Sequence, residues 1–144
     1  MNQIRSIFRE LERTAEKKLN IICSAIHEEY DHRLSITGHN FYAYHFPGSK
    51  GWNEKFRPLP KNFTLLNGSG LGQLLPHISY DLVLSGSKFG AWQNLSQIAN
   101  YLKLPHINIE HTANHYNSPN MTEKIHNIRS DVDVFISNWS VKNW

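Results

Sequence analysis

The sequence predicts an α/β protein whose sheet is mainly parallel and doubly wound, with helices on both faces. Short apolar runs of strand length alternate with helical patterns along the 144 residues. Several of these runs are apolar throughout, as expected of strands that are covered on both faces. Hydrophobic residues make up 40% of the chain and charged residues 19%, which indicates one globular domain with a core of its own.

The predicted elements follow one another in a regular order. Apolar residues at helical spacing predict an amphipathic helix over residues 3–18, which precedes the α/β domain at 19–144. Strands are predicted at 19–26, 40–46, 63–67, 81–86, 107–111 and 132–137. Helices are predicted at 27–38, from the glycine-rich loop to 77, at 89–102, at 122–129 and from 139 onward, and 47–62 is predicted as a long surface loop. Strand, helix, strand in succession favours right-handed crossovers, and so a Rossmann-like sheet of about six strands.

The helix ends carry sequence signals of their own. Gly38 is predicted to close the helix at 27–38, because glycine readily adopts a positive φ. Ser85 or Ser87 is predicted to cap the helix at 89–102.

Composition narrows the function classes. The single cysteine, Cys23, excludes an internal disulfide, and neither a signal peptide nor an apolar run of about 18 residues is found. We therefore expect a cytoplasmic protein with no membrane span. The net charge is +3, but the basic residues of the first helix alternate with glutamates, so nucleic-acid binding is not expected.

Phosphate and metal motifs are incomplete. The loop at 67–73 is glycine-rich and follows a strand, yet it matches neither G-x-G-x-x-G nor a P-loop, and a flexible turn is the better interpretation. His111 and His115 are four residues apart, but they follow a strand rather than lying on a helix, and no cysteine supports them. We expect no metal site and no cofactor.

Candidate binding residues lie where strands end, because ligands of open α/β sheets bind outside the carboxyl ends of the strands. The strand at 107–111 is predicted to point Ile107 and Ile109 inward and to end on polar residues. Candidates at three strand ends are Glu110, His111 and Thr112, then His27 and Glu28, then Ser85 and Ser87. A structural interpretation stays open for all three groups: His111 as a loop histidine beside a polar strand end, the acids as residues that suit the first turn of a helix, and the serines as helix caps.

Three stretches together resemble the amino-terminal domain of GT-B glycosyltransferases, particularly the family-4-like retaining enzymes. They are HEEYDHRLSITGHNFYAY, YDLVLSGSKFGAWQNLSQIANYLKLPHINIEHT and DVDVFISNWSVKNW, and the likeness covers 19–144. In that family the amino-terminal domain holds the acceptor, and a second domain binds the nucleotide-sugar donor. The resemblance implies transfer of a sugar to a hydroxyl acceptor, with His111 at the reaction centre and with Glu110 and Thr112 orienting it or binding the acceptor.

The chain departs from that family in three places. HEEY follows the first strand where the family often has a glycine-rich loop, the helix at 3–18 has no fixed counterpart, and the donor-binding domain is absent from these residues. Half of a cleft should not catalyse efficiently, so the resemblance implies a partner chain or carboxy-terminal domain that completes it. The alternative is a non-catalytic Rossmann-like binding or structural module.

Overall fold

The structure is a computed structural model that describes residues 17–46, 50–68, 70–88, 90–110 and 128–143. The helix predicted at 3–18 lies almost entirely outside these residues, and so does most of the one predicted at 122–129. Residues 128–130, which are described, are not helical.

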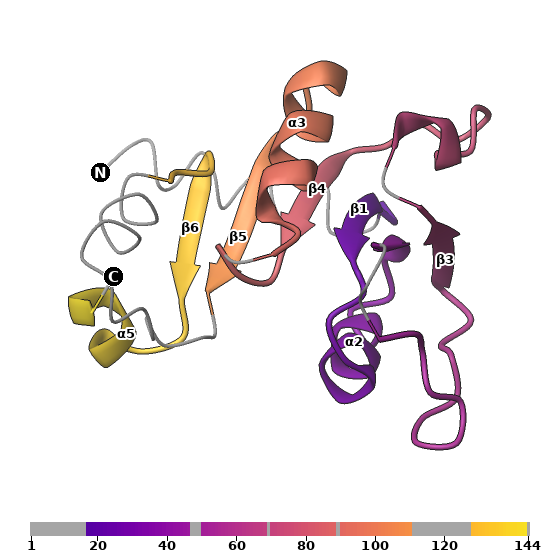
Figure 1. Ribbon diagram of the computed structural model, residues 1–144, viewed down its shortest axis with the longest axis horizontal. Coiled ribbons are helices and arrows are strands. Elements are labelled where there is room, and N and C mark those ends of the chain that lie inside the picture. Colours follow the sequence, from indigo (N-terminus) through magenta and orange to yellow (C-terminus); the bar gives the residue numbers. More distant parts are fainter. Residues whose placement is uncertain (1–16, 47–49, 69, 89, 111–127, 144) are drawn as a thin grey trace.

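Six parallel strands form a single sheet (Figure 1). Their bounds are β1 Asn20–Ser24, β2 Asn40–His45, β3 Phe63–Asn67, β4 Leu82–Ser85, β5 His106–Glu110 and β6 Val132–Phe135. The strand order is β3-β2-β1-β4-β5-β6, and every neighbouring pair is parallel. The predicted Rossmann-like class is confirmed. The chain moves outward from β1 to β3 and then returns to lay β4 on the other side of β1, so the order reverses between β1 and β4.

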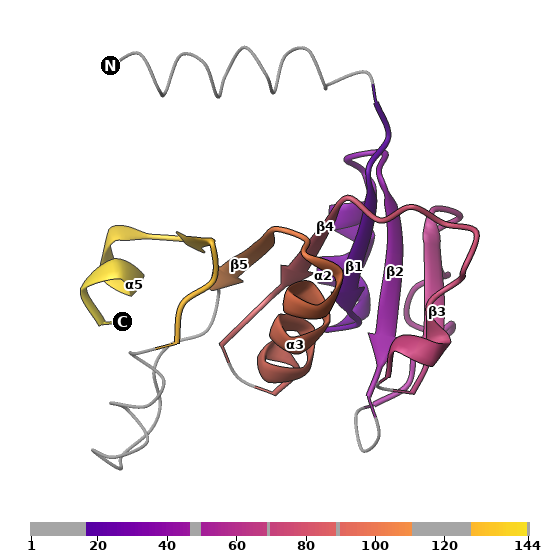
Figure 2. The same ribbon diagram turned by 90° about the horizontal axis from the view of Figure 1, so that it is seen from above.

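Helices cover the centre of the sheet on both faces (Figure 2). The helical elements are α2 Glu28–Ser35, the 3-10 turn η1 Leu71–Gln73, α3 Trp92–Leu102 and α5 Asn138–Asn143. Leu95 and Ile98 of α3 pack on one face of the sheet, against Ile22 and Val83. On the opposite face Cys23 and its apolar neighbours pack with Leu34 of α2. Strand residues next to each other therefore enter different cores, which explains the continuous apolar runs.

One end of α2 follows the prediction, at Gly38, and the other is capped by a residue that was not predicted as a cap. The His27 ring accepts the Tyr30 N–H on Nδ1 at 3.2 Å and so caps the first turn of α2. Gly38 has φ +79° and donates its N–H to the Ser35 carbonyl, as a glycine that closes a helix does.

The predicted cap of α3 is wrong. This helix begins at Trp92, its N-cap is Ala91, and no side chain caps it. Gly90, at φ +61°, turns the chain just before the helix starts. Ser85 cannot cap because its hydroxyl is bonded elsewhere, to residues of β5.

The inward side of β5 is also not the predicted one. Ile107 and Ile109 are only half-buried, whereas His106, Asn108 and Glu110 are all 4% exposed or less. The register explains this, because Val83 is paired with His106 and Ser85 with Asn108. The polar side of β5 therefore continues the face that α3 covers, while its isoleucines share the α2 face with Leu84.

Coverage of the sheet falls off toward β6. Val132 and Val134 are paired with Ile107 and Ile109, and so lie on the α2 face of the sheet. They are 51% and 43% exposed. Among the described residues, α2 lies too far along the sheet to cover them (Figure 1).

Candidate functional site

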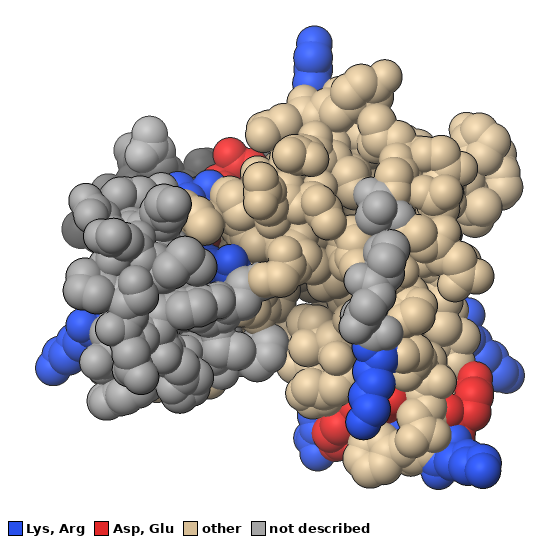
Figure 3. Space-filling model, in the orientation of Figure 1, with Lys and Arg blue, Asp and Glu red and all other residues tan. Residues whose placement is uncertain are grey.

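The candidate site lies at the edge of the sheet formed by the carboxyl ends of the strands. All six strands end at this edge because they are parallel, and the order reverses between β1 and β4. A crevice at such a reversal is the usual ligand site of open α/β sheets. Charged side chains gather over α2 and the loop after β2, while most of the other described surface in the same view carries neither sign (Figure 3).

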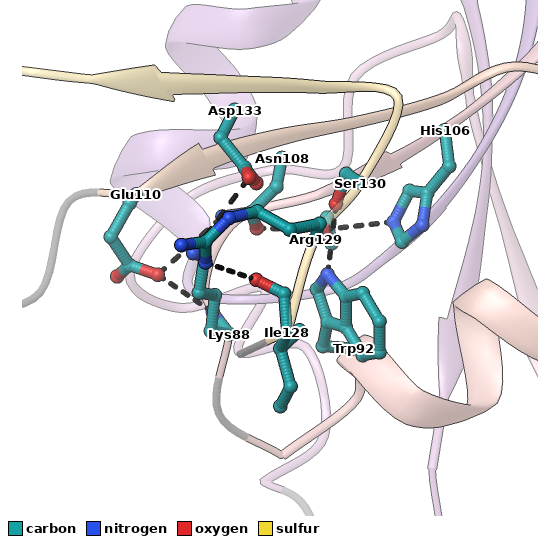
Figure 4. A network of polar contacts seen from close by, with 10 residues as sticks. Lys88, Trp92, His106, Asn108, Glu110, Ile128, Arg129, Ser130 and Asp133 are labelled. Carbon is teal, nitrogen blue, oxygen red and sulfur yellow. Dashed lines mark hydrogen bonds and ion pairs between the residues drawn. The ribbon is translucent and has the colours of Figure 1, made fainter. Parts of the chain in front are cut away.

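A chain of buried hydrogen bonds links β4 to β5 at this edge (Figure 4). The Ser85 hydroxyl donates to Asn108 Oδ1 at 2.7 Å and lies 3.0 Å from His106 Nε2. Because the hydroxyl proton goes to Asn108, the ring must donate from Nε2, which fixes its tautomer. Burial lowers the pKa of His106, and this favours the neutral ring. The three side chains therefore form a satisfied neutral network.

A charged cluster continues this network toward β6 (Figure 4). Glu110 is 0% exposed, and its Oε2 accepts the Lys88 N–H at 2.7 Å and lies 3.5 Å from Asn108 Nδ2. Lys88 Nζ lies 3.7 Å from Asp133 Oδ2 and 5.7 Å from the centre of the Phe135 ring. Buried lysines and glutamates are rare unless they are paired, so we name Lys88, Glu110 and Asp133 the buried charge cluster.

Burial and the neighbouring charge shift the pKa of Lys88 in opposite directions. Burial lowers the pKa of its ammonium, and the Asp133 carboxylate beside it partly restores that pKa. Asp133 keeps a second oxygen, Oδ1, that is buried and has no hydrogen-bond partner among the described residues. In the described part of the chain the cluster thus holds one acceptor without a donor, within β6 beside Asn108 of β5.

Further contacts hold β6 against β5 and α3. Asp131 accepts the His106 N–H on Oδ2 at 2.7 Å, and Trp92 donates its indole N–H to Ser130 Oγ at 2.9 Å. The Trp92 ring also lies 5.4 Å from the His106 ring, centre to centre. The first turn of α3 is thereby fixed to the segment that enters β6.

The end of β1 supplies a second group of polar residues. His27 and Glu28 begin α2, and Glu28 Oε1 accepts the Asn53 N–H at 2.7 Å. Its own backbone N–H and that of Asn53 lower the pKa of Glu28. A cavity of about 80 Å³ opens here, between the start of α2 and the described part of the loop after β2, and His27, Glu28 and Asp31 are among its lining residues.

The candidate residues predicted from the sequence divide between these two places. Ser85 and Glu110 belong to the buried network, whereas His27 and Glu28 line the cavity at β1. Ser87 is half-buried beside Lys88 in the chain. His111 and Thr112 lie outside the described residues.

Sequence reasoning did not find the partners of these residues: Lys88, Asn108, Asp133 and Asp31. A signal for Asn108 was present in the alternation His106, Asn108, Glu110, which places three polar residues on one side of a strand. Lys88 and Asp133 are distant in sequence and meet only through the order of the sheet, so no local pattern marks them.

In the described part of the chain, no group of three or more histidine, cysteine, aspartate or glutamate residues could hold a metal ion. None of the helices seen there has the length and hydrophobicity needed to cross a bilayer.

The site and the sheet define a Rossmann-like α/β protein with a polar edge at the carboxyl ends of its strands. Comparison with protein-family models, curated proteins and solved structures finds no match to the chain in any of the three.

Proposed function

We propose that the chain is the acceptor-side half of a GT-B glycosyltransferase, which transfers a sugar from a nucleotide-sugar to a hydroxyl acceptor. A partner chain or a further domain would supply the donor-binding half of the cleft. The proposal includes a cytoplasmic location. It also includes transfer with retention of the configuration at the sugar's anomeric carbon, as the family resemblance implies.

One observation carries the proposal: the polar edge stands at the point where the strand order reverses. β1 and β4 are neighbours there. His27 and Glu28, which follow β1, line a cavity, while Ser85 at the end of β4 is buried and bonded to β5. Glu110, the last residue of β5, is held by the Lys88 N–H and directly precedes His111 in the chain. A fixed residue before His111 supports its role, because a catalytic group must be positioned by its neighbours.

The test uses the complete polypeptide that the gene encodes, together with any partner chain that co-purifies with it. We expect His111→Ala to lower transfer from a radiolabelled nucleotide-sugar about a hundredfold or more, the size of effect typical of a lost acid–base or electrostatic group. His115→Ala is the matched control, since it removes a second histidine four residues away. Equal activity of His111→Ala and the parent protein would remove His111 from the reaction.

The second candidate function is a non-catalytic binding or structural module, and the buried network favours it. Ser85 and Asn108 are 1% and 0% exposed and are bonded to each other, so both contribute to the fold in the absence of any ligand. Under this alternative no nucleotide-sugar is consumed with any acceptor, while the protein still binds its ligand. An assay of donor consumption next to a binding assay separates the two functions.

A further inference from the structure

We propose that the cavity at the carboxyl end of β1 binds the hydroxyl-bearing edge of a sugar ring, with Asp31 Oδ1 as the acceptor of the hydroxyl proton. The inference deepens the proposed function, on which it rests, because it names the class of acceptor and the residue that receives it.

Asp31 has a buried acceptor that the protein leaves unused. The residue is 1% exposed, and its Oδ2 accepts the Ile26 N–H at 2.9 Å. Its Oδ1 is buried and has no hydrogen-bond partner among the described residues. A buried oxygen left in this state costs free energy, so such atoms are uncommon in native proteins and call for an explanation. Since Asp31 lines the cavity, a ligand group there can supply the missing donor.

The chemistry of the carboxyl group narrows the class of ligand. Burial raises the pKa of Asp31 to about 7; the backbone N–H groups of Ile26 and His27 oppose this rise, and Glu28 adds to it. The carboxyl group therefore exists in both forms near neutral pH. A hydroxyl donates to the carboxylate form, in which Oδ1 is an acceptor, whereas an amide NH₂ at the same place offers it no acceptor. The carboxylates of Glu28 and Asp31 repel an anion, and among the described lining residues Lys50 is the one lysine or arginine that offsets them. The described residues contain no cluster fit for a metal ion.

The opposite wall of the cavity suits the rest of a sugar. Trp52 lines it and is half-buried, with its indole N–H donated to the Arg57 carbonyl at 2.8 Å and its ring 6.1 Å from that of Phe63, centre to centre. A tryptophan fixed in this way presents an apolar surface on which the C–H face of a pyranose can pack, and such rigid aromatic rings dominate binding energetics. Lys50 adds a donor for a second hydroxyl.

The loop that carries Trp52 is held in place on α2. Glu29 Oε2 accepts from Arg57 Nε at 2.8 Å, and Glu28 accepts the Asn53 N–H. Asn62 donates from Nδ2 to the carbonyls of Ser35 and His39, at 2.8 and 2.7 Å. Because the walls are joined before a ligand arrives, little conformational entropy is lost on binding.

The volume sets how much of the sugar enters. A cavity of about 80 Å³ has room for a few water-sized groups but not for a whole sugar ring. It therefore takes one hydroxymethyl arm or one edge of a ring, while the remainder of the ring lies against Trp52 at the mouth.

The experiment titrates the complete polypeptide with the methyl glycosides of glucose, galactose and mannose, and follows the Trp52 indole resonance by NMR. We expect at least one glycoside to give a saturating shift, and Asp31→Asn to raise its Kd about tenfold or more, since it turns the free acceptor into a donor. Asp81→Asn is the matched control, because Asp81 also accepts one backbone N–H, that of Asn20, at the opposite edge of the sheet.

A second variant keeps the test decisive if Asp31→Asn fails to fold. Trp52→Leu removes the stacking ring and leaves Asp31 intact, and we expect it to weaken binding of the same glycoside. The proposal is overturned if no glycoside gives a saturating shift up to 100 mM, on the order of the weakest useful affinities. It is overturned equally if both variants bind as tightly as the parent. Binding that needs Asp31, without any transfer of sugar, would keep this site and reject the glycosyltransferase.

Discussion

Asp31 links the cavity at β1 to the pH dependence of folding. Its pKa rises from an ordinary 3.8 to about 7 in the folded protein, chiefly through burial. The folded state therefore binds this proton more tightly than the unfolded state does. The part of the free energy of unfolding that depends on Asp31 is highest below the pKa of the unfolded state, about 4. It is lost as the pH rises to the pKa of the folded state, about 7. The full loss is roughly 4 kcal/mol as an upper limit.

We therefore predict that Asp31→Asn removes this part of the pH dependence. The amide keeps an oxygen for the Ile26 N–H and has no charge to desolvate. Urea unfolding of both proteins at pH 5 and pH 8 measures the effect, because the groups that lie away from Asp31 titrate alike in the two. We expect the parent protein to lose stability relative to the variant as the pH is raised. A constant difference between them would mean that the Asp31 pKa is not raised.

Single residues of the site were only partly predictable from the sequence. His27, Glu28 and Glu110 could be located because they directly follow apolar runs, which mark the carboxyl ends of strands. Asp31 could not, since an aspartate in the first turn of a helix ordinarily faces water and favours the helix dipole. Its burial comes from the packing of α2 at the end of β1, where its Oδ2 accepts the Ile26 N–H, and this is a tertiary effect.

Among the elements, α3 ends in a way that can be tested. Lys103 follows the last residue of α3 with φ 55°, in the left-handed region that costs a residue with a Cβ about 1 kcal/mol or more. We predict that Lys103→Gly raises the free energy of unfolding by roughly 0.5–1 kcal/mol. Gln97→Gly, at an exposed position within the same helix, should lower it by a similar amount.

Urea unfolding measures both glycine variants. If Lys103→Gly raises the free energy of unfolding and Gln97→Gly lowers it, the gain comes from relieving the backbone strain at Lys103. A general effect of glycine on α3 would instead lower both values. A loss of stability in both would show that Lys103 makes contacts worth more than its backbone conformation costs.

The elements themselves were largely predictable, and the errors have physical causes. Strands were located within a few residues because their apolar runs are bounded by turn residues. The start of α3 was wrong because Ser85 and Ser87 match a cap in sequence, whereas the Ser85 hydroxyl is used between β4 and β5. The inward side of β5 was wrong because hydrophobicity predicts the buried side only where the buried partners are apolar, and Ser85 is not.

For the molecule as a whole, the sheet is covered unevenly, and this predicts where it opens first. Ile22 and Val83 at the centre are 0% exposed and are packed under α3, whereas Val132 and Val134 of β6 are half-exposed. We expect the amides of β1 and β4 to exchange hydrogen only through global unfolding. Those of β6 should exchange at least about a hundredfold faster.

Hydrogen exchange followed by NMR or mass spectrometry checks this difference, with the free energy from urea unfolding as the reference for the global step. Equal protection of β1 and β6 would mean that something else covers the α2 face of β6 in solution, and it would direct attention to the residues that the structure does not describe.

The strand order has one more consequence. β1, β2 and β3 are adjacent in the sheet and consecutive in the chain, and so are β4, β5 and β6. Among the described residues the two halves share one strand pair, β1 with β4, and the apolar cores on both faces of the sheet, one of them including α3. A cut in the connection before Asp81 would therefore leave two polypeptides, each with a complete three-stranded half. When the two polypeptides are mixed in solution, we expect them to associate by re-forming the β1–β4 strand pair. Each half on its own would then report, by binding, whether the other half is present.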